Sequence, residues 1–365
     1  MKHIQALPLF LILMLTACKE EESGSPGDSG TITPGHAGPV EHIDAAERLA
    51  ATNLETSRDP IDKEIKVFKA EVRGAFDEER FEELDKQASE QRTSRPVFDN
   101  GSEKLFQFYE GLSNRFHTGE DGHLTDFAKY ERWLKKHPDS LAAHIGLADL
   151  WVDYAWFARG SGYADTVSDA QWQAFRQRLE QAGETLGKAA KLPESDPYWY
   201  CVALTVGLGQ GWSADVFNQV TSEGNKLAPT FWSIDNKRAH TLLPRWFGEE
   251  GDWEAYADKV SKRKDGLGAE AYARIVMQLS TFYADVFRDS DASWEITREG
   301  LLILRKKYPK SIYIHNCLAY YAVLGRDRDL AKATFEELGD EYDEEVWEEP
   351  ERYVHFRTWA QTGKW

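Results

Sequence analysis

The sequence predicts an all-α protein built from stacked pairs of helices. Apolar residues recur at intervals of three and four along most of the chain, the spacing that puts them on one face of a helix. Alternating Val, Ile and Thr runs bounded by Asn-Gly or Asp-Gly turns, which would indicate strands, do not occur in series. A helix end, a proline and a new aromatic-bearing helix follow one another repeatedly in the same order, which indicates a repeated helical unit.

Residues 1–17 have the form of a secretory signal peptide. Lys2 supplies a short basic region, and Leu7–Leu15 is an apolar run too short to span a bilayer. Leu15-Thr16-Ala17-Cys18 resembles the lipobox of bacterial lipoproteins, in which the chain is cut before the cysteine and that cysteine is acylated, for example with palmitate. The resemblance implies lipidation at Cys18, and the alternative is an ordinary signal peptide with a chance cysteine.

Residues 18–40 predict a disordered tether, because they are polar, rich in Gly, Ser and Pro, and nearly free of large apolar side chains. No later segment reaches eighteen consecutive apolar residues, so the body would be attached to a membrane through its acyl chains alone. Lys19 follows the cysteine, and the resemblance to lipoproteins of Gram-negative bacteria then implies the outer membrane. We therefore expect a cell-envelope protein that faces the periplasm.

The charge of the chain argues against some partners. Its 44 basic and 62 acidic residues give a formal net charge of -18. Such a surface repels phosphate backbones and anionic lipid, so we expect no nucleic-acid binding and no broad attachment to a lipid surface.

The body is expected to begin with N-terminal helices over residues 41–122. Apolar side chains at helical spacing mark two of these helices: Phe81, Leu84 and Ala88, then Leu105, Phe108, Tyr109 and Leu112. The loop between them carries Pro and Asn-Gly, and Ser102 is the expected cap of the second helix.

Residues 123–365 are expected to form a region of helical repeats, continuous with residues 60–122. Pro138, Pro193, Pro229 and Pro309 each end one helix and allow another to begin. The last three are separated by 36 and 80 residues, and periods near 40 are typical of stacked helix pairs.

The unit from Pro309 to Leu338 resembles a tetratricopeptide repeat. Leu318, Ala319, Ala331 and Phe335 occupy the spacing at which that family places small and sealing residues between its two helices. The resemblance implies a right-handed solenoid of helix hairpins, an irregular one here because the other units depart from the pattern. Separately, "YAWFARGSGYADTVSDAQWQAFRQRL" and "PRWFGEEGDWEAY" resemble an uncharacterised family of bacterial envelope and secreted proteins, which implies a helical domain over most of the body and no chemistry.

Two cysteines remain after Cys18. Cys201 and Cys317 each lie eight residues after a corner proline, which places them on the first helices of different units. Because units so far apart in a stack exceed the Cα separation of a disulfide, we expect two buried, reduced thiols.

The stretch from Trp156 to Asp169 admits two interpretations. A phosphate-binding loop needs a preceding strand and a Lys, and both are missing, whereas Gly160 and Gly162 suit a helix end and Ser168 with Gln171 fits a capping box. We therefore expect a corner between helices. The alternative is that Arg159, Tyr163 and Asp165 line a binding cleft.

The chain has thirteen tryptophans, most of them at spacing that favours packing in the core. The loop around Pro244 is different, since two tryptophans there are costly unless something covers them. The candidate binding groove therefore consists of Trp156, Arg159, Tyr163, Asp165, Arg245, Trp246 and Trp253.

Catalytic and metal signatures are missing from the sequence. No His-Glu-x-x-His, zinc spacing or Gly-x-Ser-x-Gly turn occurs, and runs of acidic residues are typical of solvated helix faces. His117 and His123 flank a loop in which a cation site is conceivable, but the ordinary chemistry of a solvated turn is the favoured explanation. We expect no catalytic residue, no metal and no cofactor.

These observations favour a lipid-anchored adaptor whose helical repeats bind another envelope protein or a peptide segment. The alternative is an envelope hydrolase or carbohydrate-processing domain with a site near Arg159–Asp165 and Arg245–Trp253. A pocket with two carboxylates would favour the enzyme, and a shallow aromatic groove would favour the adaptor.

Overall fold

The computed structural model describes residues 47, 50–51, 54–56, 59–113, 119–162 and 164–364, and most of these residues are helical. The expected all-α class is confirmed. The expected signal peptide, the tether and Cys18 lie outside the described residues. Among the described residues, no helix has both the length and the apolar character to cross a bilayer.

The N-terminal part has one short strand and four helices: β1 (Glu55–Thr56), α3 (Pro60–Asp77), α4 (Phe81–Ser94), α5 (Lys104–Leu112) and α6 (Glu120–Lys136). The seven apolar residues expected to mark α4 and α5 are all buried. The expected cap is wrong: α5 begins after Glu103, and Ser102 belongs to the preceding turn, where its amide donates to Asn100 Oδ1 (2.9 Å). The expected boundary at residues 122 and 123 falls inside α6.

Five helix pairs follow. The odd-numbered helices are α7 (Leu141–Arg159), α9 (Pro197–Gln210), α11 (Trp232–Thr241), α13 (Ala269–Leu279) and α15 (Ile312–Leu324). The even-numbered helices are α8 (Asp169–Ala189), α10 (Ala214–Leu227), α12 (Asp252–Ser261), α14 (Trp294–Lys307) and α16 (Arg328–Leu338). Short 3-10 turns follow α7 and α13, namely η1 (Ala164–Thr166) and η2 (Ser280–Phe282), and the chain ends with β2 (Glu341–Tyr342), α17 (Glu344–Trp347) and α18 (Pro350–Thr362).

As predicted, each of the four corner prolines lies between two helices. They follow α6, α8, α10 and α14, and each precedes the next odd-numbered helix. A further corner, between α12 and α13, has no proline. There Gly268 precedes Ala269, the first residue of α13, which lies forty residues after Pro229. Helix α13 therefore begins a unit in the middle of the 80-residue interval between Pro229 and Pro309, where no proline marks it. Gly268 has a φ of +64°, a conformation that glycine adopts at little cost, so it replaces proline as the residue that separates two helices.

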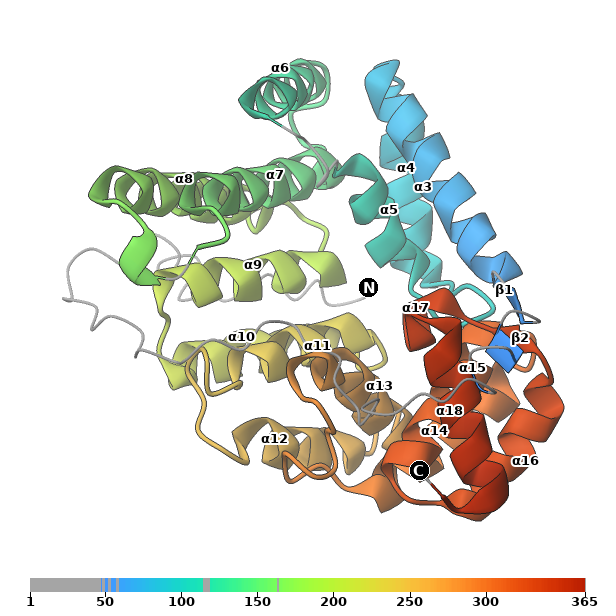
Figure 1. Ribbon diagram of the computed structural model, residues 1–365. Helices are drawn as coiled ribbons and strands as arrows, with labels where there is room; N and C mark the ends of the chain where they lie inside the picture. Colours follow the sequence, from blue (N-terminus) through green and yellow to red (C-terminus); the bar gives the residue numbers. More distant parts are fainter. Residues whose placement is uncertain are drawn as a thin grey trace.

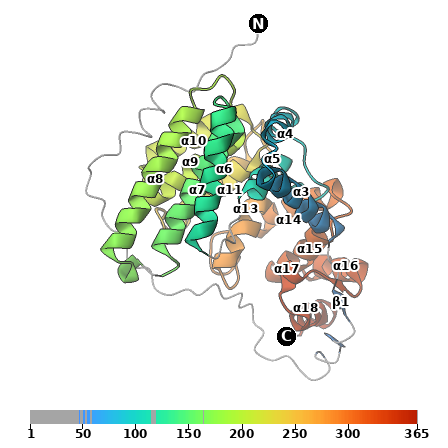
Figure 2. The same ribbon diagram turned by 90° about the horizontal axis from the view of Figure 1, so that it is seen from above.

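The helices pack mainly against their neighbours in sequence. Each odd-numbered helix contacts the even-numbered helix after it, and α7 also contacts α9, α9 contacts α11, and α11 contacts α13. Helices α9 and α15 are apolar and buried on nearly every face, whereas α10 and α16 bury one face, which is typical of inner and outer helices of a layer. Figure 2 shows α6, α7 and α8 side by side at one end of this arrangement.

The buried apolar residues form two main clusters that meet along α11. One extends from Val72 to Ile234 and the other from Ala239 to Ala360. Cys201 on α9 and Cys317 on α15 are buried in different clusters and are both free, as predicted. Burial raises the pKa of each thiol, so neither is an exposed reactive thiolate.

The two ends of the described chain lie together. The backbone of β1 pairs in parallel with β2, and Glu47 contacts His355 on α18 (3.1 Å). In Figure 1 the blue N-terminal helices therefore lie beside the red C-terminal helices. Asp62 on α3 and Asp343, the cap of α17, face each other at this junction. Burial and then the mutual repulsion of these acids raise the pKa of Asp343 to about 7.

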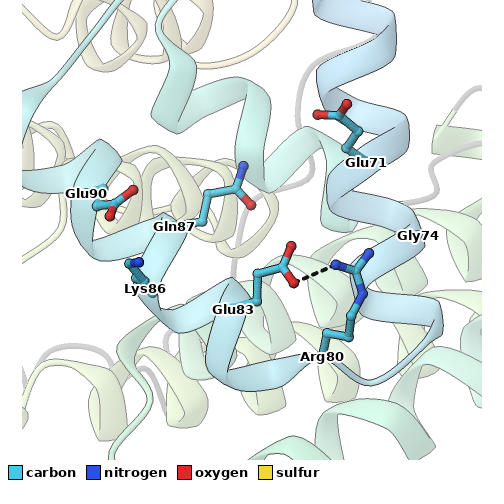
Figure 3. A pocket seen from close by; sticks show the side chains of 7 residues that line it. All are labelled: Glu71, Gly74, Arg80, Glu83, Lys86, Gln87 and Glu90. Carbon is cyan, nitrogen blue, oxygen red and sulfur yellow. Dashed lines mark hydrogen bonds and ion pairs between the residues drawn. The ribbon is translucent and has the colours of Figure 1, made fainter.

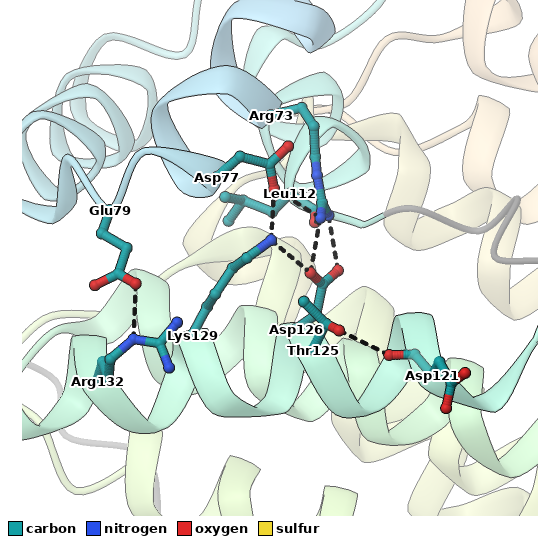
Figure 4. Close-up of polar contacts among 9 residues, drawn as sticks. All are labelled: Arg73, Asp77, Glu79, Leu112, Asp121, Thr125, Asp126, Lys129 and Arg132. Atoms are coloured by element: carbon teal, nitrogen blue, oxygen red, sulfur yellow. Dashed lines mark hydrogen bonds and ion pairs between the residues drawn. The ribbon is translucent and has the colours of Figure 1, made fainter.

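Helix α6 is attached to α3 by a polar cluster (Figure 4). Arg73 donates two hydrogen bonds of 2.7 Å to the buried carboxylate of Asp126, and Lys129 donates to Asp77 (2.6 Å). A second, more exposed pair joins Arg132 to Glu79 (2.7 Å). The buried pair is the stronger link, because exposed ion pairs contribute little.

Replacing Asp343 by Asn is expected to change the pH dependence of stability. The folded-state pKa of Asp343 near 7 exceeds its ordinary value of 3.8, so its stabilising contribution is complete below about pH 4 and is lost as the pH rises through 7. We expect Asp343→Asn to raise the free energy of unfolding at pH 8 by about 2–4 kcal/mol and to change it little at pH 4. Denaturant unfolding at stepped pH measures this, with exposed Asp139→Asn as control. Parallel curves for both variants and the wild type would contradict it.

Removing the buried acid between α3 and α6 is expected to destabilise the protein. Asp126→Asn removes the buried charge to which Arg73 donates two hydrogen bonds and leaves Arg73 only the more exposed Asp77 as an ionic partner, so we expect the free energy of unfolding to fall by about 2–4 kcal/mol. Arg132→Gln, which breaks the exposed pair in the same interface, is the matched control and should cost less than about 1 kcal/mol. Equal losses for the two variants in urea unfolding would show that burial does not distinguish them.

Candidate binding surface

The stretch between α7 and α8 is a corner between two helices, as predicted. Gly160 ends α7 with a φ of +73°, and Ser168 and Gln171 form a capping box at the start of α8. The side-chain amide of Gln171 also reaches back to the carbonyl of Arg159 (3.4 Å). The capping box therefore fixes the end of one helix as well as the beginning of the next.

Arg159 is held in place at this corner. Its guanidinium donates to the carbonyls of Gly160 and Gly162, both at 3.1 Å. The guanidinium carbon lies 5.6 Å from the ring centroid of Trp156 on α7 and 5.4 Å from that of Trp172 on α8. Both are cation–π distances, so the charge is positioned between two indoles that remain partly exposed.

The loop between α11 and α12 presents a second arginine in the same way. Its turn is tight, since a Cβ on Gly248 would lie 1.8 Å from the carbonyl oxygen of Leu242. The guanidinium carbon of Arg245 lies 5.8 Å from the ring centroid of Trp246 and 5.3 Å from that of Phe282 on η2. Arg245 is exposed, and both rings are partly buried.

The two segments meet through their tryptophans. The rings of Trp156 and Trp246 are 5.9 Å apart and meet edge to face at 81°. Four of the seven expected groove residues therefore come together. We call the resulting surface the arginine–tryptophan patch; it consists of Trp156, Arg159, Trp172, Arg245, Trp246 and Phe282.

The charge of the patch comes from its arginines. Burial and then the nearby Arg245 lower the pKa of Arg159, which shows that the two cations interact. His240 lies against the rings of Trp246 (5.9 Å) and Phe282 (5.6 Å), and burial together with Lys237 and Arg245 lowers its pKa to about 4. His240 is therefore neutral at pH 7.

The patch has hydrogen-bond donors without acceptors. Within the described residues, neither Arg159 nor Arg245 forms an ion pair with a carboxylate. The indole N–H of Trp246 is buried and has no hydrogen-bond partner there either. A ligand that supplies acceptors could therefore bind the guanidinium groups at this surface, whereas the enclosed indole N–H of Trp246 is not accessible to it.

The other expected groove residues do not join the patch. Trp253 is completely buried on the inner face of α12 and donates to the Tyr283 hydroxyl (2.8 Å), because its position in the first turn of α12 directs it into the core. Asp165 is exposed on η1, and Tyr163 lies outside the described residues. His117 also lies outside them, and His123 is buried against Asp153 (3.0 Å).

The sequence did not single out Trp172, His240 and Phe282 as parts of this surface. Their common feature is position, since they lie near the corners that follow α7, α11 and α13. The corner before α13 has no proline, so the proline pattern did not reveal α13 as the first helix of a unit or Phe282 as a residue that follows such a helix. A search for aromatic residues near the C-terminal end of every odd-numbered helix, on either side of it, would have found them.

A different depression lies between α3 and α4, lined by Glu71, Gly74, Arg80, Glu83, Lys86, Gln87 and Glu90 (Figure 3). Arg80 and Glu83, neighbours at the start of α4, are joined by a hydrogen bond of 2.5 Å. The lining has three acids, two bases and no aromatic side chain, so we do not regard it as the binding surface. Among the described residues, no group of three or more His, Cys, Asp or Glu side chains could hold a metal ion.

The different positions of two tryptophans predict different costs of truncation. Trp253→Ala removes a fully buried indole, so the free energy of unfolding should fall by about 3–5 kcal/mol. Trp172→Ala removes a partly exposed ring, and we expect a loss of about 1–2 kcal/mol. Urea unfolding of the two variants measures both values, and equal losses would contradict these assignments.

Comparison with known proteins gives one match. No curated protein and no solved structure matches the chain. Residues 68–206, from α3 to α9, match the model of a family described as Domain of unknown function (DUF4034). The match includes the corner around Arg159 and not the loop around Trp246, so it covers less of the body than the sequence resemblance implied, and it brings no activity with it.

Proposed function

We propose that the protein is a lipid-anchored adaptor of the bacterial cell envelope, which binds another envelope protein or a peptide segment at the arginine–tryptophan patch. The observation that carries the proposal is that segments following three odd-numbered helices, α7, α11 and α13, bring partly exposed rings and two arginines together. Tryptophan and arginine are the residues most enriched among those that dominate binding energy at protein interfaces.

The proposed framework is an irregular right-handed solenoid of tetratricopeptide type. Contacts between successive odd-numbered helices support it. The small and sealing residues of the last unit support it too, because Ala319, Ala331 and Phe335 are buried between α15, α16 and their neighbours. Solenoids bind extended partners along surfaces that several repeats share, and the patch is such a surface.

The proposed cellular location rests on the N-terminal sequence. Lipidation of Cys18 and the tether that follows would hold the body at the outer membrane, facing the periplasm, with the acyl chains as its only membrane contact. No catalytic step, cofactor or nucleic acid enters this proposal. The hydrolase alternative would need a carboxylate pair at the ligand, and the patch contains arginines and rings.

Site-specific photo-crosslinking tests the adaptor. A photoreactive phenylalanine analogue at position 282 keeps the ring of Phe282 in the patch, and in the native envelope we expect it to capture a discrete protein partner. The same analogue at position 157 is the matched control, since Phe157 is 45% exposed on α7 and packs toward His123 instead. No product at position 282 above that control would contradict the adaptor, and capture of a glycan or turnover of one would favour the hydrolase.

A further inference from the structure

We infer that the arginine–tryptophan patch binds the carboxylates of an acidic peptide segment in the partner protein. The inference rests on the proposed function and specifies the chemistry of the ligand. In this inference Arg159 and Arg245 bind the carboxylates, and the peptide segment lies on the aromatic rings of the patch.

The first argument is the contrast between these arginines and the others. The chain has an excess of acidic residues, and most partly buried arginines are paired: Arg73 with Asp126, Arg92 with Asp196, Arg263 with Asp235 and Arg274 with Glu270. Arg159 and Arg245 are adjacent and have no such partner within the described residues. Two neighbouring cations repel each other, and a ligand carboxylate would relieve that repulsion.

The second argument is the direction of the hydrogen bonds that remain available. Arg159 uses one terminal nitrogen on two carbonyls, which leaves its other N–H groups for a ligand. Arg245 is exposed and forms no hydrogen bond within the described residues. The guanidinium fork matches a carboxylate, which offers acceptors alone.

The third argument is the extent of the surface. The rings come from α7, α8, the α11–α12 loop and η2, so the patch is larger than a single small anion requires. In an extended peptide, alternate side chains are about 7 Å apart on one face. A segment that carries acidic and apolar residues at every second position, as in Glu-Ser-Leu-Ser-Glu, has both kinds of side chain on one face and could therefore contact the arginines and the rings together.

Peptide binding to the purified full-length protein in detergent tests the inference. The probe is a fluorescent peptide that repeats Glu-Ser-Leu-Ser, so that Glu and Leu share one face of the extended chain, and the comparison peptide has Gln in place of Glu. We expect the Glu peptide to bind about tenfold or more tightly than the Gln peptide, and the double variant Arg159→Gln, Arg245→Gln to lose that difference. The variant Arg288→Gln is the control, because Arg288 is exposed and pairs with Asp289 elsewhere.

Three results would overturn the inference: equal affinity for both peptides, wild-type affinity in the double variant, or competition by inorganic polyphosphate stronger than by unlabelled Glu peptide. Circular dichroism shows whether the double variant folds. If it does not, the double variant Arg159→Lys, Arg245→Lys replaces it, because lysine keeps the positive charge but lacks the two-pronged guanidinium. We then expect an affinity for the Glu peptide between that of the wild type and that of the Gln peptide. The adaptor itself is tested separately. Crosslinking at position 282 that persists in the double variant would overturn the carboxylate partner and leave the adaptor in place.

Discussion

The arrangement of the protein depends on carboxyl groups placed at the N-terminal ends of its odd-numbered helices. The first amides of a helix have no partner within it, and they attract acceptors. Asp196 caps α9 and also accepts a hydrogen bond from Tyr109 on α5 (2.8 Å). Glu103, in the segment before α5, lies at the start of α11 and contacts Ser233. Asp59 accepts from the amide of Tyr313 at the start of α15 (3.1 Å). The N-terminal helices are thus attached to three odd-numbered helices at their first turns.

This attachment determines which edge of the helix stack remains accessible. Residues 59–113 cover the N-terminal ends of α9, α11 and α15, while the patch lies at the C-terminal ends of α7, α11 and α13. The C-terminal end of a helix carries partial negative charge, which favours cations there. Arg159 follows this rule, since its guanidinium donates to the carbonyls just past the end of α7. The dipole of α7 therefore helps to hold an arginine at one edge, as the N-terminal ends of α9, α11 and α15 bind acids at the other.

The sequence predicted what depends on local spacing. The helices, the proline corners and the capping box at Ser168 follow from residues within one or two turns of each other, and the structure agrees with all of them. The two free thiols followed from the spacing of the corner prolines, which put the cysteines in different units. It could not predict contacts between distant segments. Glu103 and Ser233 are 130 residues apart, and only the fold shows that this acid serves another helix instead of its own.

Trp246 and Trp253 illustrate the same limit within one loop. Both occur in "PRWFGEEGDWEAY", and both were expected to line the groove. The helix begins at Asp252, so Trp253 lies in its first turn on the buried face with Ala257 and Val260, whereas Trp246 lies before the helix in the turn closed by Gly248. The position at which α12 begins therefore decides whether each indole packs in the core or remains at the surface.

The positions of the chain ends give the patch an orientation. At the start of the described chain, Glu47 lies against α18, Glu55–Thr56 pairs with β2 and Asp59 contacts the start of α15, at the edge covered by the N-terminal helices. In Figure 1 this edge is at the right and the corner between α7 and α8 is at the left. If acyl chains on Cys18 anchor the protein, the tether therefore reaches the body on the side away from the patch. The body would then present its arginines and rings away from the point of attachment, where a partner that is not itself bound to the same leaflet could reach them.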